Sequence, residues 1–257
     1  MSQAVARVGR FLILPLLFLA IWELVSGWSP LARGLRQLLP PPSVVLLYAW
    51  GLLMTGEILN HIGRSVLRVL GGFGAAALVG IPIGLGIGLW ALFEDTVGPV
   101  VEFLRPIPPP AWIPLGILWF GIGDAQNMFI LFLGALFPIV LNTIAGVRGV
   151  DQTLVWGALT LGGTHRQVLR EIIIPGAIPL IWTGLRIGLG VGWMALVAAE
   201  LMAARSGLGF LIQSARYAFV TERVLAGMVV IGLLGLAMDS GMRALQRRLL
   251  RWNVAFQ

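Results

Sequence analysis

Four polar side chains stand inside long apolar stretches of this sequence, where a charge or an unpaired amide is expensive. They are Asn142, Arg186, Glu200 and Asp239. Ionisable groups in such surroundings face protein or water, form ion pairs, and often mark the route of a solute. Asp239 precedes Arg243 by one helical turn, a spacing that predicts an ion pair within one helix. Glu23, near the end of another apolar run, is interpreted as an interfacial group.

The stretch around Arg186 predicts the most specific site. Arg186, Trp193 and Glu200 recur at heptad spacing, so they lie close to one face of a helix. Trp182 stands one turn before Arg186. We expect this stripe, with Asn142 on the preceding stretch, to line a route for a solute, where Arg186 offers an anion a fixed cation. Two alternatives stay open: Arg186 bonds a carbonyl or carboxylate of another helix, and Asn142 hydrogen-bonds between helices.

The sequence lacks the residues of most covalent chemistry. It has no cysteine and no lysine, and its two histidines, His61 and His165, are far apart. Thiolate metal sites, a lysine Schiff base and the lysine-containing phosphate loop are therefore excluded. We predict that the chain has no catalytic residue, holds no metal and binds no cofactor. If ATP powers it, partner subunits must bind the ATP and Mg²⁺.

The elements that carry these residues are long apolar helices. Hydrophobic residues make up 58% of the chain and charged residues 11%, whereas soluble domains have about 25% charged residues. Several runs reach the ~20 residues that cross a bilayer. We predict an all-α polytopic membrane protein with about six transmembrane helices, the first an uncleaved span rather than a signal peptide. The spans cover about Phe11–Trp28, Val66–Leu89, Ile107–Ile122, Gln126–Val147, Gly176–Met202 and Val224–Met242.

Arginines predict the orientation. An even number of spans puts both termini on one side, and arginines flank both termini and the linker between spans four and five. They are Arg7, Arg10, Arg148, Arg166, Arg170, Arg243, Arg247, Arg248 and Arg251. The positive-inside rule makes that side cytoplasmic, and attributes the net charge of +7 to this bias rather than to nucleic-acid binding. Seven arginines fall on the opposite side and blur the signal: Arg33, Arg36, Arg64, Arg68, Arg205, Arg216 and Arg223.

The chain divides into three predicted parts. Residues 1–38 hold the first span and the start of an external loop, residues 39–65 an external loop with an interfacial helix, and residues 66–252 the core. Glycines recur every four residues in spans two and five, forming smooth ridges that let another helix approach closely. They are Gly80, Gly84, Gly88, Gly184, Gly188 and Gly192.

Residues 151–175, between spans four and five, form the most polar internal stretch on the predicted cytoplasmic side. Asp151 is a suitable N-cap for a helix over Gln152–Leu161, which Gly162 and Gly163 end. Thr164 and Gln167 have the spacing of a capping box for a second short helix over His165–Ile173. Two exposed helices joined by glycines suit docking into a groove of a soluble partner. An ordinary amphipathic linker is the alternative.

The same stretch resembles the cytoplasmic signature loop of ABC importer permeases, in which a glycine is followed by nine residues and an isoleucine-to-proline ending. Here Gly162 is followed by nine residues, Ile172 and then Pro175, and Ala158 matches the second alanine of the signature. Trp156 and Gly157 depart from it. The surrounding sequence is similar to the nitrate, sulfonate, taurine and bicarbonate class of these permeases. The similar segments include residues 104–115, 120–124, 137–143 and 183–190.

This resemblance implies a location in a bacterial inner membrane, a mechanism and partners. Two permease chains, expected as a homodimer, form a pathway for a small anionic solute, two cytoplasmic ATPase subunits grip the loop, and an extracytoplasmic binding protein delivers the solute. The loop residues assigned to this coupling are Asp151, Ala158, Leu161, Gly162, Gly163, Thr164, His165, Arg166, Arg170, Ile172 and Pro175.

Three other functions are weighed against this one. A secondary transporter would show inverted repeats and paired midplane carboxylates, and neither is seen. A membrane-embedded enzyme would need a nucleophile with its base, or metal ligands, at one depth. A permease for a vitamin precursor or an aromatic acid stays open, because in this family the binding protein supplies most of the selectivity.

Overall fold

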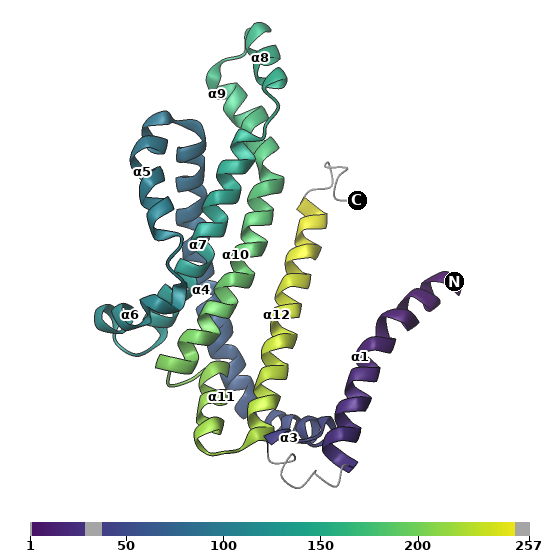
Figure 1. Cartoon of the computed structure of the whole chain (residues 1–257). Helices are drawn as coiled ribbons and strands as arrows, with labels where there is room; N and C mark the ends of the chain where they lie inside the picture. The colour runs from purple at the N-terminus through teal and green to yellow at the C-terminus, as the bar shows by residue number, and fades with distance from the viewer. Residues whose placement is uncertain (1, 29–37, 250–257) are drawn as a thin grey trace.

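The computed structural model describes the backbone of residues 2–28 and 38–249. It describes the side chains of residues 13–27 and 38–249. Every regular element in these ranges is a helix (Figure 1). In chain order they are α1 Ser2–Trp28, α3 Pro42–Met54, α4 Glu57–Leu89, α5 Ala91–Leu104, η1 Pro109–Trp112, α6 Ile113–Phe120, α7 Asp124–Arg148, α8 Gln152–Thr160, α9 His165–Val168, η2 Leu169–Ile173, α10 Ile174–Ala203, α11 Leu208–Tyr217 and α12 Thr221–Leu249. The predicted all-α fold is confirmed.

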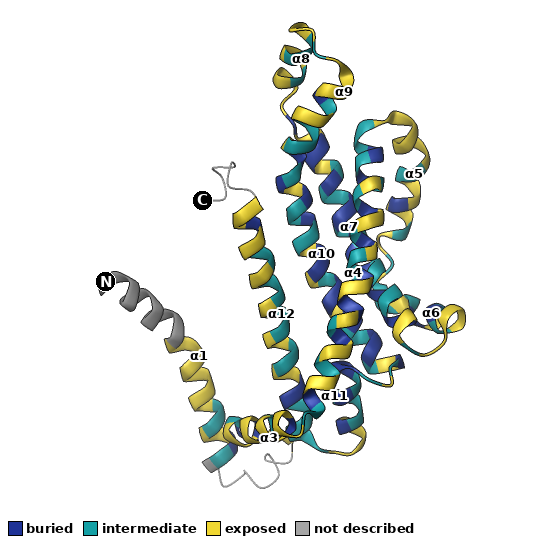
Figure 2. Ribbon diagram, turned by 180° about the vertical axis from the view of Figure 1, so that it is seen from behind, coloured by how far each residue is buried: buried dark blue, intermediate teal, exposed yellow. Residues whose placement is uncertain are grey.

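Helix α7 lies at the centre of the bundle, between α4 and α10 (Figure 1). It carries half of the largest fully buried side chains, among them Ile130, Leu131 and Ile139. Helix α12 leans against α10 at one end, and α1 stands apart from the core and packs on α3. Figure 2 shows the consequence: buried positions are dense in α4, α7 and α10, and sparse in α12 and α1.

The predicted glycine ridges lie at the contacts of α7 with its two neighbours. A Cβ atom built on Gly84 of α4 would stand 2.5 Å from Cβ of Thr143 on α7. One built on Gly188 of α10 would stand 2.8 Å from the carbonyl oxygen of Ala135 on α7. Gly80, Gly88, Gly184 and Gly192 have similarly close neighbours on α7. Helices without side chains at these points approach closely enough for backbone-to-backbone packing.

Four helices of the described chain are long and apolar enough to cross a membrane. They are α4, α7, the continuous run His165–Ala203 that ends in α10, and α12. Helix α4 begins at Glu57, nine residues before the predicted start of span two. The prediction was too short because the polar residues in this first part of α4 find partners inside the protein, as described below. The division of the chain into three parts stays a prediction.

The predicted third span, Ile107–Ile122, is wrong as a single helix. The structure has a short 3-10 helix there, followed by α6 with only 8 residues. Three consecutive prolines, Pro108 to Pro110, supply no backbone amide donors, so a regular helix cannot run through them. After α4 the chain reverses direction in α5 instead. Helix α5 packs beside α4, although its sequence includes Glu94, Asp95 and Glu102.

Glu23 lies where α1 meets α3. Its carboxylate accepts hydrogen bonds from the backbone amide of Ser43, at 3.0 Å, and from the Ser43 hydroxyl, at 2.7 Å. The carboxylate therefore caps the start of α3, a role consistent with a position at the end of a span. The predicted assignments at residues 1–12, 28–37 and 250–257 lie outside the described side chains.

Candidate functional site

The loop formed by α8 and α9 projects from one end of the bundle, beyond the other helices (Figure 1). Asp151 begins it: its carboxylate accepts a hydrogen bond from the backbone amide of Thr153 at 2.8 Å. This hydrogen bond lowers the pKa of the Asp151 carboxyl group, because it stabilises the ionised form. The capping prediction is confirmed, and α8 ends at Thr160, one residue before the predicted end.

The two glycines that follow are required for different reasons. Gly162 has a φ of +88°, a left-handed conformation that side chains resist. Gly163 donates from its amide to the carbonyl of Ala158 at 2.9 Å, and a Cβ on Gly163 would stand 2.8 Å from the Ala158 oxygen. The first glycine turns the chain, and the second lets it pass close to α8. This explains the paired glycines in the loop.

The capping box predicted after the glycines is present. The amide of Thr164 donates to Oε1 of Gln167 at 2.9 Å, and the amide of Gln167 donates to the Thr164 hydroxyl at 3.4 Å. The predicted end of this helix at Ile173 is wrong. After α9 the chain passes through a π-helical turn, η2, and continues into α10. The helical run from His165 to Ala203 therefore has 39 residues. Pro175 interrupts nothing because it stands in the first turn of α10, and the wide π turn precedes it.

The loop therefore joins the bundle through a continuous helix. Apolar side chains stand exposed at its tip: Trp156 is 69% exposed and Leu161 is 90% exposed. Exposed apolar groups on a polar projection mark an interaction surface. Of the residues predicted to couple, the exposed ones are Asp151, Leu161, Gly162, Thr164, His165, Arg166 and Arg170, and the half-buried ones are Ala158, Gly163, Ile172 and Pro175.

The predicted stripe on α10 faces several different neighbours. Arg186 faces α12, where its Nε and Nη2 atoms donate to the two carboxylate oxygens of Asp239. Asp239 also accepts from Arg243 at 3.1 Å, so the predicted pair within α12 is confirmed. Trp193 is buried against α12, close to Gly235. The open alternative of a carboxylate partner for Arg186 on another helix is thus the one that the structure supports.

Glu200 does not face α12 as Arg186 and Trp193 do, because its partners lie on other elements. Its side chain is fully buried and pairs with Arg68 of α4 at 2.6 Å. Asn142 donates to the carbonyl of Pro138 within α7, and its Cβ lies against Gly184. Trp182 has a buried Nε1 atom with no hydrogen-bond partner among the described residues. Arg186 and Trp193 share the α10–α12 contact, whereas Glu200 and Asn142 belong to other contacts.

Arg68 is the buried charged residue whose role the sequence interpretation missed. Its guanidinium is almost fully buried and has a partner on every nitrogen. Nε donates to Asp124 at 2.8 Å, Nη1 donates to Glu200 at 2.6 Å and to the carbonyl of Ser206 at 2.7 Å, and Nη2 donates to the Ser206 hydroxyl at 2.9 Å. Three helices and the turn after α10 therefore meet at one cation.

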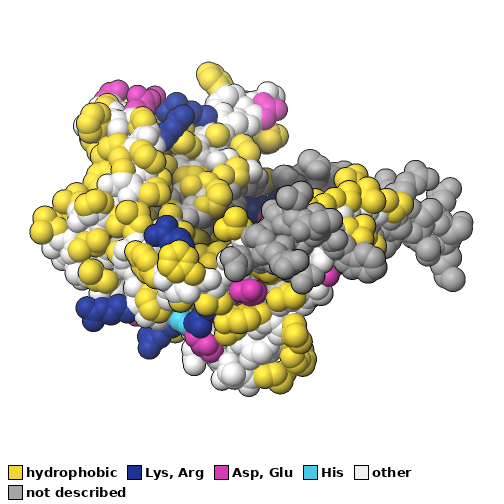
Figure 3. Space-filling model, turned by 60° about the horizontal axis from the view of Figure 1, so that its bottom comes forward, with side chains coloured by type: hydrophobic (Ala, Val, Ile, Leu, Met, Phe, Trp, Pro, Cys, Tyr) yellow, Lys and Arg dark blue, Asp and Glu magenta, His cyan; other side chains and the backbone are white. Residues whose placement is uncertain are grey.

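Neighbouring groups complete this cluster. The Ser65 hydroxyl donates to Glu200 at 2.8 Å and accepts from the amide of Leu208, and the amide of Gly209 donates to Glu200 at 2.9 Å. His61 accepts from the amide of Gly207 at 3.1 Å. Figure 3 shows arginine, acidic and histidine side chains close together on this end of the molecule. One sequence signal was available: His61, Ser65 and Arg68 lie about one turn apart at the start of an apolar helix.

An all-helical bundle of this kind, with a projecting loop and charges in the interior, is typical of a transport permease. Residues 76–251 match the family model described as "Binding-protein-dependent transport system inner membrane component". The chain belongs to this family, so the resemblance found in its motifs is confirmed. The protein is a multi-pass component of a transport system of the inner membrane.

Several relatives of known name are similar along nearly the whole chain. The taurine transport system permease protein TauC of Escherichia coli is 40% identical over 98% of this chain and 90% of its own length. An aliphatic sulfonates permease protein, SsuC of Bacillus subtilis, is 36% identical over 96% of this chain and 88% of its own. The nitrate import permease protein NrtB of Synechocystis is 34% identical over 86% of this chain and 83% of its own.

Solved structures show the same fold at lower identity. An amino acid ABC transporter, solved with histidines, matches with a TM-score of 0.62 and 19% identity over 79% of this chain and 96% of its own. The inward-facing MetNI methionine ABC transporter matches with a TM-score of 0.58 and 20% identity over 73% of this chain and 95% of its own. These matches place the helices in the architecture of transporter permeases.

Proposed function

We propose that this chain is the permease subunit of an ATP-driven importer for a small anionic solute of the sulfonate and nitrate class. The observation that carries the proposal is the similarity to taurine, sulfonate and nitrate permeases over most of the chain, at 34% to 40% identity. Two copies of the chain form the pathway, two ATPase subunits supply the energy, and a binding protein delivers the solute. The chain itself catalyses no covalent chemistry.

In this proposal the α8–α9 loop is the docking surface for the ATPase. Its exposed Trp156 and Leu161 would fill an apolar groove, and Arg166 and Arg170 would meet acidic groups at the rim. Because α9 runs into α10 without an end, a tilt of the docked loop would move α10 as a lever. The coupling residues predicted above keep this role as a proposal.

The proposed orientation puts the loop and the end of α12 in the cytoplasm. Arg148, Arg166, Arg170, Arg247 and Arg248 lie at this end, in agreement with the positive-inside rule. Some of the arginines that blurred the charge signal have acidic partners at the other end. Arg68 binds Glu200 and Asp124, and Arg223 binds Glu57. Paired arginines add little to the net charge of that side.

The test is reconstitution. The chain is expressed with its ATPase, purified, and inserted into proteoliposomes with the ATPase outside and the binding protein inside. We expect two permease chains and two ATPase chains per particle by light scattering. Taurine, ethanesulfonate or nitrate should move from the vesicle lumen, which holds the binding protein, to the outside medium only when ATP is present outside. A stable single chain that moves any of these anions without ATP would contradict the proposal and favour a secondary transporter.

A further inference from the structure

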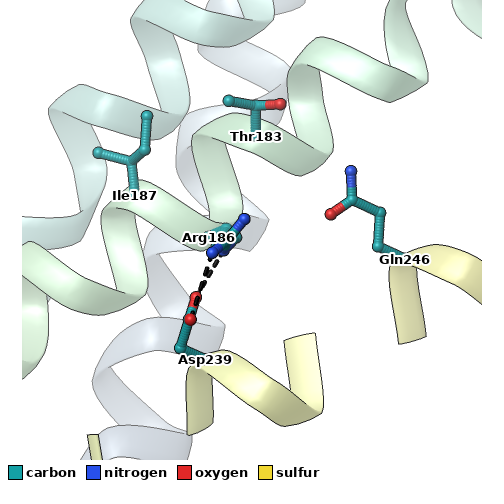
Figure 4. Close-up of a pocket in the computed structure, with 5 residues that line it drawn as sticks. All are labelled: Thr183, Arg186, Ile187, Asp239 and Gln246. Carbon is teal, nitrogen blue, oxygen red and sulfur yellow. Dashed lines mark hydrogen bonds and ion pairs between the residues drawn. The ribbon is translucent and has the colours of Figure 1, made fainter. Parts of the chain in front are cut away.

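A cavity of about 580 Å³ opens between α10 and α12, around the ion pair of Arg186. Its lining is Thr183, Arg186, Ile187, Asp239 and Gln246 (Figure 4). The volume is in the range that small-molecule sites occupy, about 300–1,000 Å³. The lining joins three chemical types, an apolar wall, hydrogen-bonding groups and charges, as in sites that orient a small ligand.

Only one edge of the Arg186 guanidinium forms hydrogen bonds with the described protein. Nε and Nη2 donate to Asp239, and Nη1 has no hydrogen-bond partner among the described residues. The side chain is 39% exposed, so this free edge is open to the cavity. A guanidinium presents parallel N–H groups that fit the oxygens of a carboxylate, nitrate or sulfonate. The unused edge is therefore a donor site of the right shape for an oxyanion.

Gln246 provides an independent sign of a ligand. The residue is 9% exposed, yet its amide has no hydrogen-bond partner in the part of the chain that the structure describes. Figure 4 shows the amide extending from α12 into the space between the two helices. The polar atoms of this amide line the cavity and are not fully enclosed by protein, so their hydrogen-bonding capacity is open to a ligand. An acceptor held in the cavity would take a hydrogen bond from the amide nitrogen.

The local charge also favours an anion. Arg186 and Arg243 both bind Asp239, so one carboxylate serves two cations and the group carries a net positive charge. Asp239 is 36% exposed and occupies one edge of Arg186 as a bound anion would. A single further negative charge would balance the group.

We infer that this cavity is a transient binding site for the oxyanion group of the transported solute, held by the free edge of Arg186 and the amide of Gln246. Asp239 acts as a tethered competing anion that keeps the affinity low. A transport site must bind well enough to admit its solute and weakly enough to release it. This inference rests on the proposed import function and adds the place where the solute's charged group binds.

The test measures direct binding and uptake in parallel. The complete importer in nanodiscs is titrated with ethanesulfonate and with sodium nitrate by calorimetry, and with neutral ethanesulfonamide as the probe without charge. The variants are Arg186→Gln, Asp239→Asn, Gln246→Ala and the charge exchange Arg186→Asp with Asp239→Arg. The control is Arg248→Gln, an exposed arginine on α12 that does not line the cavity.

We expect both anions, but not the sulfonamide, to bind the wild type at millimolar concentrations. Asp239→Asn should tighten anion binding by about tenfold, and Arg186→Gln should weaken it by at least about tenfold. Gln246→Ala should weaken it severalfold, and Arg248→Gln should leave it unchanged. The charge exchange should restore neither binding nor uptake, because the exchanged arginine stands on the other helix.

Opposite results would overturn the inference. If the charge exchange restores wild-type uptake, the pair is only a structural link between α10 and α12. If Asp239→Asn leaves anion affinity unchanged or lowers it, Asp239 is not a competitor; this variant keeps the test decisive even where Arg186→Gln fails to assemble. Absence of anion binding to the wild type also overturns it. Failure of the proposed function looks different: the anions bind, but no ATP-dependent uptake occurs.

Discussion

Two arginines of this protein stand in apolar surroundings and are treated in opposite ways. Arg68, between α4, α7 and the turn after α10, is 2% exposed, and all its nitrogens are bound by protein. Arg186, between α10 and α12, is 39% exposed and shares one carboxylate with Arg243. The first site is closed and complete, whereas the second is open and has donors to spare.

Under the proposed function, this difference separates a residue that holds the fold from a residue that binds the solute. A buried charge must have every donor satisfied, or its desolvation cost is not offset. Such a site cannot also take a ligand without breaking its own contacts. Arg186 can, because the free edge of its guanidinium lines the cavity and has no partner among the described residues. We therefore expect substitutions in the region around Arg68 to cost stability, and substitutions around Arg186 and the α8–α9 loop to cost transport.

The largest effect should come from Arg68. Arg68→Gln leaves the buried carboxylate of Glu200 without its cation, which costs about 3–5 kcal/mol of folding free energy. Arg186→Gln should cost less than about 1 kcal/mol, because its pair is screened by solvent. Thermal unfolding of the purified protein in detergent measures both. Arg64→Gln, an exposed arginine 3.7 Å from Asp124, is the control; equal shifts for Arg68 and Arg186 would break the comparison.

A smaller loss of stability is expected from the packing of the closed region. Gly84→Ala would bring a methyl group to 2.5 Å from Cβ of Thr143 and should cost about 1–3 kcal/mol. Gly74→Ala, in the same helix with open space around it, should be neutral or stabilising by up to about 1 kcal/mol. The unfolding midpoint should therefore fall for Gly84→Ala, and stay unchanged or rise for Gly74→Ala. A shift of the same size for both would mean that the α4–α7 contact yields easily.

In the loop we expect transport to fall while the fold persists. Gly162→Ala places a side chain at a φ of +88°, a local strain of about 1–2 kcal/mol that would displace α9. Gly157→Ala is the matched control, since neither glycine has an atom within 4 Å of an added Cβ and Gly157 is helical. ATP-driven uptake should drop severalfold for Gly162→Ala alone, with normal expression of both. Parallel loss of expression would assign Gly162 to folding instead.

The smallest effect should appear at the Asp151 cap. Its native pKa is lowered by the hydrogen bond from Thr153, so the cap stabilises α8 above the unfolded pKa of about 3.9 and loses this contribution as the pH falls through the native value. Hydrogen exchange of the α8 amides should therefore accelerate only once the pH falls below about 3.9, and not between neutral pH and that value, after correction for intrinsic rates. Helix α9 serves as the internal control, because its cap, Thr164, does not titrate. Equal changes in both helices would show that the whole loop opens.

How far the sequence could be interpreted depended on how far apart the interacting residues are. The caps at Asp151 and Thr164, the turn at Gly162 and the glycine ridges follow from residues within a few positions of one another, and local rules of helix geometry predicted them. The third span failed for a different reason. Hydropathy alone favoured Ile107–Ile122, but the prolines prevent one continuous helix there.

By itself the sequence determined the class of the protein, the family, the helical composition and the shape of the exposed loop. Composition and short-range spacing carry that information without knowledge of any contact. Only the tertiary structure decided that Arg68 joins Glu200 across 132 positions of sequence, and that Arg186 meets Asp239 across 53. The physical reason is that a charge in an apolar helix demands a partner but does not specify which one. That choice depends on which helices pack side by side and at what depth their side chains meet.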